Sequence, residues 1–182
     1  MRGVVQVASP NCDERPPGVE ADLIVVHGIS LPPGEFGGPW IDRLFTNTLP
    51  IDAHPYFAQI GSLRVSSHLV IGRTGAMTQY VGFKQRAWHA GKSIFLGREA
   101  CNDFSIGIEL EGTDTQAYEP AQYHALADAV AALCAAYPRL STERLVGHSD
   151  IAPGRKSDPG PAFDWQHARK LIAGACSALD RT

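Results

Sequence analysis

The stretch Leu23-Ile24-Val25-Val26-His27 is an uninterrupted apolar run that ends in a histidine. Such a run is expected of a strand that is buried on both faces. Residues 105–111 (Ser-Ile-Gly-Ile-Glu-Leu-Glu) alternate between apolar and other side chains, which predicts a second strand. A third, short strand is predicted at 145–147, directly before His148. Because strands and helical patterns intermix along the chain, the sequence predicts a single α/β domain with a central sheet flanked by helices.

The segments around these strands contain hairpin and helical patterns. A glycine-containing connection at 73–75 joins strand-like runs at 68–72 and 76–81, which predicts a hairpin. Apolar residues at helical spacing or a helical composition predict helices at 39–47, 120–136 and 164–179. Residues 1–20 are rich in proline and charge, and we expect them to form an irregular lead-in to one domain that spans residues 1–182.

The composition is that of an ordinary globular protein, with 44% hydrophobic and 19% charged residues. The net charge of −3 argues against general affinity for nucleic acids, since proteins with that affinity carry a basic surface. No apolar run approaches the ~20 residues that a membrane helix needs. Residues 1–22 lack the continuous apolar core of a signal peptide. We therefore expect a cytoplasmic protein with neither a nucleic-acid nor a membrane partner.

The four cysteines are widely scattered and form no Cys-x-x-Cys pair; they are Cys12, Cys101, Cys134 and Cys176. This spacing predicts neither a cysteine zinc cage nor a dense disulfide framework. In a cytosolic chain we expect free thiols, although the spacing also leaves room for a bridge between two of them.

Three residues that can bind a metal follow predicted strands. His27 and His148 come directly after apolar runs, and Asp158 lies in the loop ten residues after His148. Two imidazoles and one carboxylate leave the fourth position of a tetrahedral zinc ion open for water, which is typical of a catalytic site. The same spacing also fits two hydrogen-bonding histidines and an aspartate that forms a turn before Pro159.

Five longer motifs occur in a characteristic order. They are 26–33 (Val-His-Gly-Ile-Ser-Leu-Pro-Pro), 65–68 (Val-Ser-Ser-His), 86–91 (Arg-Ala-Trp-His-Ala-Gly), 102–114 (Asn-Asp-Phe-Ser-Ile-Gly-Ile-Glu-Leu-Glu-Gly-Thr-Asp) and 147–160 (Gly-His-Ser-Asp-Ile-Ala-Pro-Gly-Arg-Lys-Ser-Asp-Pro-Gly). From about Ser9 to about Trp165, this series resembles the zinc-dependent N-acetylmuramoyl-L-alanine amidases of the AmpD type. The resemblance implies the mixed sheet of the type 2 amidases, a fold shared with peptidoglycan recognition proteins.

The resemblance also assigns roles to individual residues. His27, His148 and Asp158 match the family's three zinc ligands. Glu109, the first glutamate of Gly-Ile-Glu-Leu-Glu, matches the catalytic acid/base, while strand alternation alone does not separate it from Glu111 on the same face. Both glutamates also fit a solvated face of an edge strand. Lys156 matches the lysine that stabilises the oxyanion; by itself it would read as an exposed loop lysine.

Four further residues are candidates for substrate binding. Trp88 and His89 could line the groove, or could be core residues. Arg64 and Arg98 could pair with the carboxylates of a peptide, because arginine binds carboxylates in a bidentate manner. His68, at the start of a predicted strand, is expected to be structural, since a fourth protein ligand would close the position that water needs.

The resemblance implies a monomeric enzyme that hydrolyses the amide bond between 1,6-anhydro-N-acetylmuramic acid and L-alanine in soluble muropeptides during cell-wall recycling. Two alternatives stay open at this point. One is a lytic or phage-type amidase that acts on intact peptidoglycan. The other is a non-catalytic module that binds muropeptides, as some peptidoglycan recognition proteins do.

Overall fold

The computed structural model describes residues 3–179, and the first two residues of the expected lead-in lie outside this range. The strands are β1 (Val5–Gln6), β2 (Cys12–Glu14), β3 (Leu23–Ile29), β4 (Leu69–Ile71), β5 (Met77–Gln79), β6 (Gln85–Ala87), β7 (Ile94–Phe95), β8 (Arg98–Glu99), β9 (Ser105–Glu111) and β10 (Leu145–Gly147). The α-helices are α1 (Trp40–Phe45), α2 (Pro55–Ile60), α3 (Pro120–Ala136), α4 (His148–Ile151) and α5 (Trp165–Leu179), with 3₁₀ turns at Cys101–Asp103 and Thr142–Arg144.

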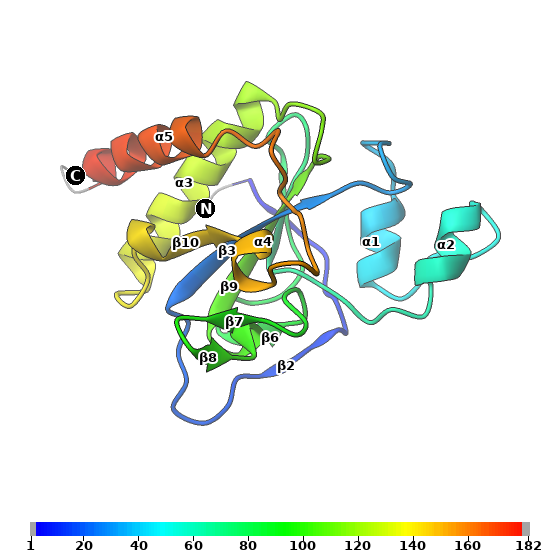
Figure 1. Cartoon of the computed structure of the whole chain (residues 1–182), viewed down its shortest axis with the longest axis horizontal. Coiled ribbons are helices and arrows are strands. Elements are labelled where there is room, and N and C mark those ends of the chain that lie inside the picture. The colour runs from blue at the N-terminus through cyan, green and yellow to red at the C-terminus, as the bar shows by residue number, and fades with distance from the viewer. Residues whose placement is uncertain (1–2, 180–182) are drawn as a thin grey trace.

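A central sheet organises the molecule (Figure 1). Within the described residues its strand order is β1-β5-β4-β9-β3-β10. The neighbours β4, β9, β3 and β10 run parallel, whereas β5 runs antiparallel to β4. The sheet is therefore mixed, and the predicted α/β class with a central mixed sheet is confirmed.

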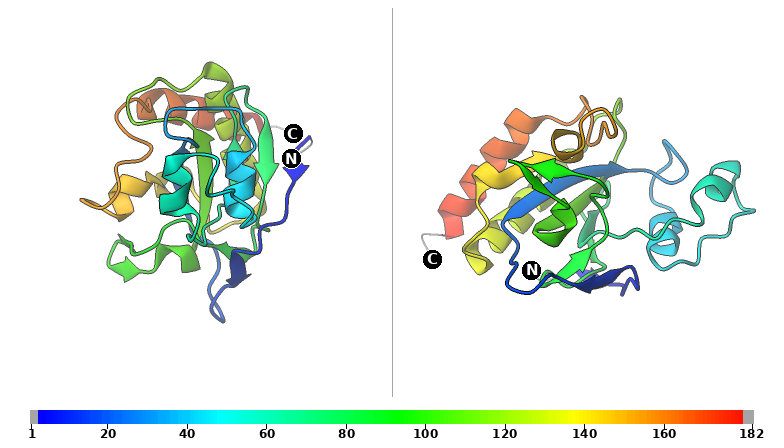
Figure 2. Two further views of the ribbon diagram at one scale, coloured as in Figure 1. Left: turned by 90° about the vertical axis from the view of Figure 1, so that its right-hand side faces the viewer. Right: turned by 60° about the horizontal axis from the view of Figure 1, so that its bottom comes forward.

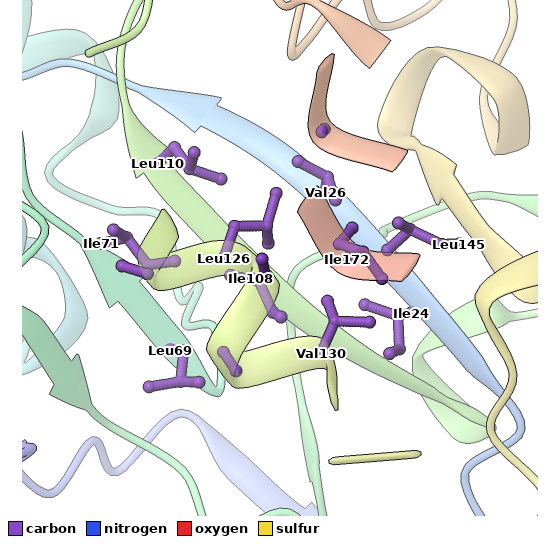
Figure 3. Packing of buried hydrophobic residues seen from close by; sticks show 14 of the residues in the cluster. Ile24, Val26, Leu69, Ile71, Ile108, Leu110, Leu126, Val130, Leu145 and Ile172 are labelled. Atoms are coloured by element: carbon purple, nitrogen blue, oxygen red, sulfur yellow. The ribbon is translucent and has the colours of Figure 1, made fainter. Parts of the chain in front are cut away.

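Helices α3 and α5 cover one face of the sheet, as Figure 1 shows. Side chains from the sheet and from both helices form a continuous apolar layer between them, drawn in Figure 3. Ile24 and Val26 of β3 point into this layer, and Leu126 of α3 and Ile172 of α5 meet them. Alternate residues of a strand point to opposite faces, so His27 must lie on the face away from these helices.

The other face is covered by shorter pieces. The hairpin of β7 and β8, the pair of β2 and β6, and helix α4 pack there, and the buried side chains include Val25, Phe104 and Ile151. Helices α1 and α2 stand together beyond the carboxyl end of β3 (Figures 1 and 2). Phe45 and Phe57 anchor these two helices in a separate apolar cluster. This face is therefore covered by several short elements, whereas two long helices cover the opposite face.

Most of the predicted elements are present. The strands at 105–111 and 145–147, the hairpin around 73–75 and the helix at 120–136 are confirmed. The edge-strand interpretation of Glu109 and Glu111 is wrong: β9 lies between β4 and β3, and all seven of its residues are buried.

The expectation of an irregular lead-in is wrong in part. Val5–Gln6 pairs in parallel with β5 at one edge of the sheet, and Cys12–Glu14 pairs with β6. Both segments pair with strands more than 70 residues away in sequence. A local sequence pattern therefore does not predict these strands. Within residues 3–179, no helix combines the length and the apolar character needed to cross a bilayer.

Candidate active site

The strand ends bring the candidate site together. In the parallel pair of β3 and β9, His27 lies opposite Glu109, and both point to the face away from α3 and α5. β10 runs parallel to β3 on its other side and ends at Gly147, so His148 begins α4 beside the end of β3. Parallel strands deliver their carboxyl ends to one edge of a sheet, which is where α/β proteins commonly place their sites.

Three donor atoms converge at this edge. The Nδ1 atoms of His27 and His148 are 2.9 Å apart, and Oδ2 of Asp158 lies 3.2 Å from the first and 3.0 Å from the second. Ligands at about 2.0 Å from a tetrahedral zinc ion stand ~3.3 Å from one another. The three donors are therefore close enough together to bind a single metal ion.

The protonation states also suit a metal. Burial lowers the pKa of His27 to about 4, so its imidazole is neutral at neutral pH. Burial by itself raises the pKa of the Asp158 carboxyl, but the adjacent imidazoles of His148 and His27 outweigh this effect and hold the pKa below its usual range. Metal ligands must be neutral imidazoles and ionised carboxylates, and the net charges of His27 and Asp158 meet this requirement.

The loop that carries Asp158 is held by contacts with two other segments. The backbone carbonyl oxygen of Asp158 accepts a hydrogen bond from the backbone N–H of Ser149 at 3.0 Å. The hydroxyl of Tyr118, a buried side chain, donates to the carbonyl oxygen of Pro159 at 3.0 Å. The carboxylate therefore projects from a fixed segment even though the loop has no regular secondary structure.

Glu109 and Glu111 have different surroundings, which the sequence pattern did not separate. The Glu109 carboxyl faces the cavity, and its Oε2 is buried without a hydrogen-bond partner among the described residues. Burial raises the pKa of Glu109 well above its ordinary value, and the nearby Asp158 charge adds to the rise. Glu111 instead accepts backbone N–H groups of Gly37 at 2.8 Å and Arg73 at 3.3 Å. Of these two glutamates, Glu109 therefore has the carboxyl oxygen without a partner, whereas Glu111 is held by backbone N–H groups.

The three donors lie at the floor of a cavity of about 630 Å³. Its walls include Leu31 from the loop after β3, Tyr56 and Ile60 from α2, and Thr113 after β9. Lys156 is exposed and lines the same cavity two residues before Asp158. Lys156 therefore adds a positive charge to the wall of this cavity.

The candidate substrate residues are placed less favourably. Of the four, only His89 lines the cavity. Trp88 donates its indole N–H to Asp13 at 3.2 Å, and Arg64 donates to the carbonyl oxygens of Gly61 and Leu63. Both side chains therefore make hydrogen bonds within the protein and do not line the cavity.

Arg98 lies at the opposite end of the sheet. It pairs with Asp22 at 2.6 Å, directly before the start of β3, and its guanidinium lies over the ring of Phe104. His68 is structural, as expected, because its Nδ1 accepts the N–H of Gly107 and its Nε2–H donates to the carbonyl oxygen of Gln85.

Sequence reasoning missed the residues that support the ligands from behind. Ala90 accepts the Nε2–H of His148 at 3.1 Å through its carbonyl oxygen, and Arg155 donates to the same oxygen at 2.6 Å. Ser105 lies behind His89, with 3.1 Å between its Oγ and the ring's Nε2. All three residues fall inside the quoted motifs, but their roles depend on contacts between segments that are distant in sequence.

Three metal donors, an unpaired carboxyl and a nearby lysine at the end of an α/β sheet are typical of a metal-dependent hydrolase. The sequence pattern of the N-acetylmuramoyl-L-alanine amidase family matches residues 17–161. The chain belongs to this family.

Within this family, the chain is most usefully compared with two AmpD proteins. The chain is 60% identical over 168 residues to the 1,6-anhydro-N-acetylmuramyl-L-alanine amidase AmpD of Salmonella typhimurium, covering 92% of this chain and 89% of the relative. A crystal structure of an AmpD derivative superposes with a TM-score of 0.92 at 57% identity, covering 94% of this chain and 96% of the other. The predicted resemblance to the AmpD type is confirmed.

A more distant structure is also informative. It is the complex of the amidase AmiD from E. coli with the substrate anhydro-N-acetylmuramic acid-L-Ala-D-gamma-Glu-L-Lys. It superposes with a TM-score of 0.61 at 30% identity, and the match covers 93% of this chain and 61% of AmiD.

Proposed function

We propose that this protein is a monomeric, cytoplasmic, zinc-dependent amidase of cell-wall recycling. Its substrate is a soluble muropeptide, and the bond cleaved joins the lactyl carbonyl of 1,6-anhydro-N-acetylmuramic acid to L-alanine. The observation that carries the proposal is the convergence of His27, His148 and Asp158 within 3.2 Å of one another beside the unpaired carboxyl of Glu109.

The donor set favours zinc over other common metals. Two imidazole nitrogens and one carboxylate oxygen around an open position are typical of catalytic zinc. Magnesium and calcium instead prefer six or more oxygen ligands. We assign His27, His148 and Asp158 as the zinc ligands.

The remaining residues would move protons and stabilise charge. Bound zinc supplies Lewis acidity, which activates water and polarises the amide carbonyl. Glu109 takes a proton from the attacking water and later donates it to the leaving nitrogen of L-alanine; its raised pKa suits a group that must both accept and donate. Lys156 places its ammonium group near the developing oxyanion.

The substrate assignment is supported by the relatives. The name of the Salmonella relative specifies 1,6-anhydro-N-acetylmuramyl-L-alanine, and AmiD holds an anhydro-muramyl peptide in its structure. The cavity of about 630 Å³ is within the range of pockets that enclose drug-sized molecules. It is therefore large enough for a sugar and the first residues of a stem peptide.

One experiment tests metal and substrate together. Purified protein is stripped with a chelator, reconstituted with zinc or magnesium, and incubated with anhydro-muramyl tripeptide. Mass spectrometry should find free anhydro-N-acetylmuramic acid and tripeptide only after zinc is restored. Full activity of verified metal-free protein would contradict the zinc assignment.

Substrate preference separates this function from that of a lytic enzyme. We expect kcat/KM to be much higher on the soluble anhydro-muropeptide than on its reducing-end counterpart, and little release of peptide from purified sacculi. Equal kcat/KM values on the two soluble sugars would favour a lytic amidase. Cell fractionation and the sedimentation mass test the cytoplasmic and monomeric assignments.

A further inference from the structure

The two ring nitrogens of His27 have different surroundings. Nδ1 points toward His148 and Asp158, and Nε2 points away from them toward the ring of His89. A neutral imidazole carries one proton, and the hydrogen bond made by one nitrogen decides whether the other is free to bind a metal. The hydrogen-bond partner of Nε2 therefore determines whether Nδ1 of His27 is free to bind a metal.

Behind His27 runs a chain of hydrogen bonds with a defined direction. Nε2 of His27 lies 2.9 Å from Nδ1 of His89, Nε2 of His89 lies 3.1 Å from Oγ of Ser105, and this hydroxyl donates to the carbonyl oxygen of Cys101 at 2.5 Å. A carbonyl oxygen can only accept. The Ser105 oxygen thus accepts the Nε2–H of His89, whose bare Nδ1 accepts the Nε2–H of His27. The chain leaves Nδ1 of His27 without a proton.

This direction matters because the site also favours the opposite tautomer. Oδ2 of Asp158 lies 3.2 Å from Nδ1 of His27, so before a metal binds, an Nδ1–H would find a carboxylate acceptor. A proton there would occupy the lone pair that a metal needs. The acceptor on His89 offsets this competition by giving the proton a partner at Nε2.

The ring of His89 is held in place by its neighbours. The amide oxygen of Asn102 accepts the backbone N–H of His89 at 3.1 Å and that of Ala90 at 2.8 Å. The ring lies against Gly107, where an added Cβ would stand 2.5 Å from a ring atom. The same segment positions the other imidazole ligand, because the carbonyl oxygen of Ala90 accepts the Nε2–H of His148.

We propose that His89 is a positioning residue that sets the tautomer of His27 through the Ser105–Cys101 chain and so raises the zinc affinity of the site. This proposal rests on the zinc-dependent function proposed above. It reassigns His89, which lines the cavity wall, from contact with substrate to support of a metal ligand.

The test compares replacements that keep or remove the acceptor. His89→Leu removes it, whereas His89→Asn places an amide oxygen near the position of Nδ1. His124→Leu, at an exposed histidine of α3, is the control. Zn²⁺ alone is titrated into metal-free proteins in competition with a chromophoric chelator. We expect His89→Leu to bind zinc about 10–100-fold more weakly than the parent, and His89→Asn and the control to stay close to the parent value.

A second readout reports the tautomer itself. In metal-free parent protein, nitrogen-15 NMR of His27 should show a protonated Nε2 and a bare Nδ1, and His89→Leu should move the proton toward Nδ1. A merely structural role of His89 would lower stability without changing this tautomer. Equal zinc affinity in His89→Leu and the parent overturns the proposal, and so does an equal loss in His89→Asn and His89→Leu.

If His89→Leu does not fold, Ser105→Ala decides, because it keeps the His89 ring and removes only the acceptor of its Nε2–H. Weaker zinc binding with a shifted His27 tautomer supports the proposal, and an unchanged affinity overturns it. Failure of the proposed function can be distinguished from failure of the role proposed for His89. A parent protein that binds no zinc contradicts that function, whereas tight zinc binding by both parent and variants contradicts only the role of His89.

Discussion

At the scale of single residues, two glutamates on one strand face have different surroundings, and we expect their substitution to have different effects. We expect Glu109→Gln to keep bound zinc and to lose about 10²–10⁴-fold in kcat, the usual contribution of a general acid/base. Glutamine retains the size of the side chain but cannot take a proton from water. Steady-state kinetics on anhydro-muramyl tripeptide, with metal content measured on the same samples, provides the check.

Glu111 is the matched comparison. Glu111→Ala should cost about 1–3 kcal/mol of stability, because two backbone N–H groups, those of Gly37 and Arg73, lose their charged acceptor. Its kcat should remain near the parent value at temperatures where the protein is folded. If kcat fell in Glu111→Ala and stayed near the parent value in Glu109→Gln, the two assignments would be reversed.

Lys156 carries a separate prediction. Removal of the rim cation in Lys156→Ala should lower kcat about 10²–10³-fold, the range seen when one oxyanion donor is lost. Zinc affinity should change little, since the ammonium group is not a ligand. Lys156→Arg preserves the charge and should recover part of the rate. Unchanged turnover in Lys156→Ala would show that this lysine is an ordinary exposed side chain.

At the scale of elements, the two faces of β3 have separate roles. Even-numbered residues such as Ile24 and Val26 pack under α3 and α5, while His27 points to the site. Stability and metal binding should therefore be separable. Leu126→Ala, in α3, should cost about 2–5 kcal/mol, as expected for a fully buried leucine.

Urea denaturation of metal-free protein measures that cost, and the chelator competition described above measures zinc affinity at a temperature where the variant is folded. We expect the affinity to equal that of the parent. A large loss of zinc affinity in folded Leu126→Ala would mean that the helical face also controls the geometry of the donors.

At the scale of the whole molecule, buried neutral histidines make stability depend on pH. Burial lowers the pKa of His68 to about 3, whereas an unfolded chain has the ordinary value of about 6.5. Between these values the unfolded state binds more protons than the folded state. The stabilisation is therefore complete above pH 6.5 and is lost as the pH falls toward 3, by up to about 1.4 kcal/mol per pH unit.

Thermal unfolding of metal-free protein from pH 7 to pH 4 checks this expectation. His68→Gln should be less stable at pH 7, because it loses one of two buried hydrogen bonds, yet its Tm should fall less steeply with acid. If Tm fell equally steeply with decreasing pH in the parent and in His68→Gln, His68 would not be a source of the pH dependence.

The sequence alone was sufficient for the central elements and for singling out His27, His148 and Asp158, which the structure brings together. The run Leu23–Val26 and the alternation of 105–111 predicted buried strands, because side-chain periodicity directly reflects which faces are covered. The motifs carried the resemblance to the amidase family. Helix α2 was not predicted, since it has six residues and a histidine, His54, as its N-cap.

Only the tertiary structure decided what each polar side chain faces. Glu109 and Glu111 are equivalent in the strand pattern, but the loops that reach Glu111 come from Gly37 and Arg73, distant in sequence. Arg98 looked suitable for a carboxylate and instead pairs with Asp22 at the other end of the sheet. Periodicity determines whether a side chain is buried, whereas its partner depends on how separate segments cross in space. For that reason the sequence indicated the amidase family and its ligands, and the structure distinguished the free carboxyl from the bound one.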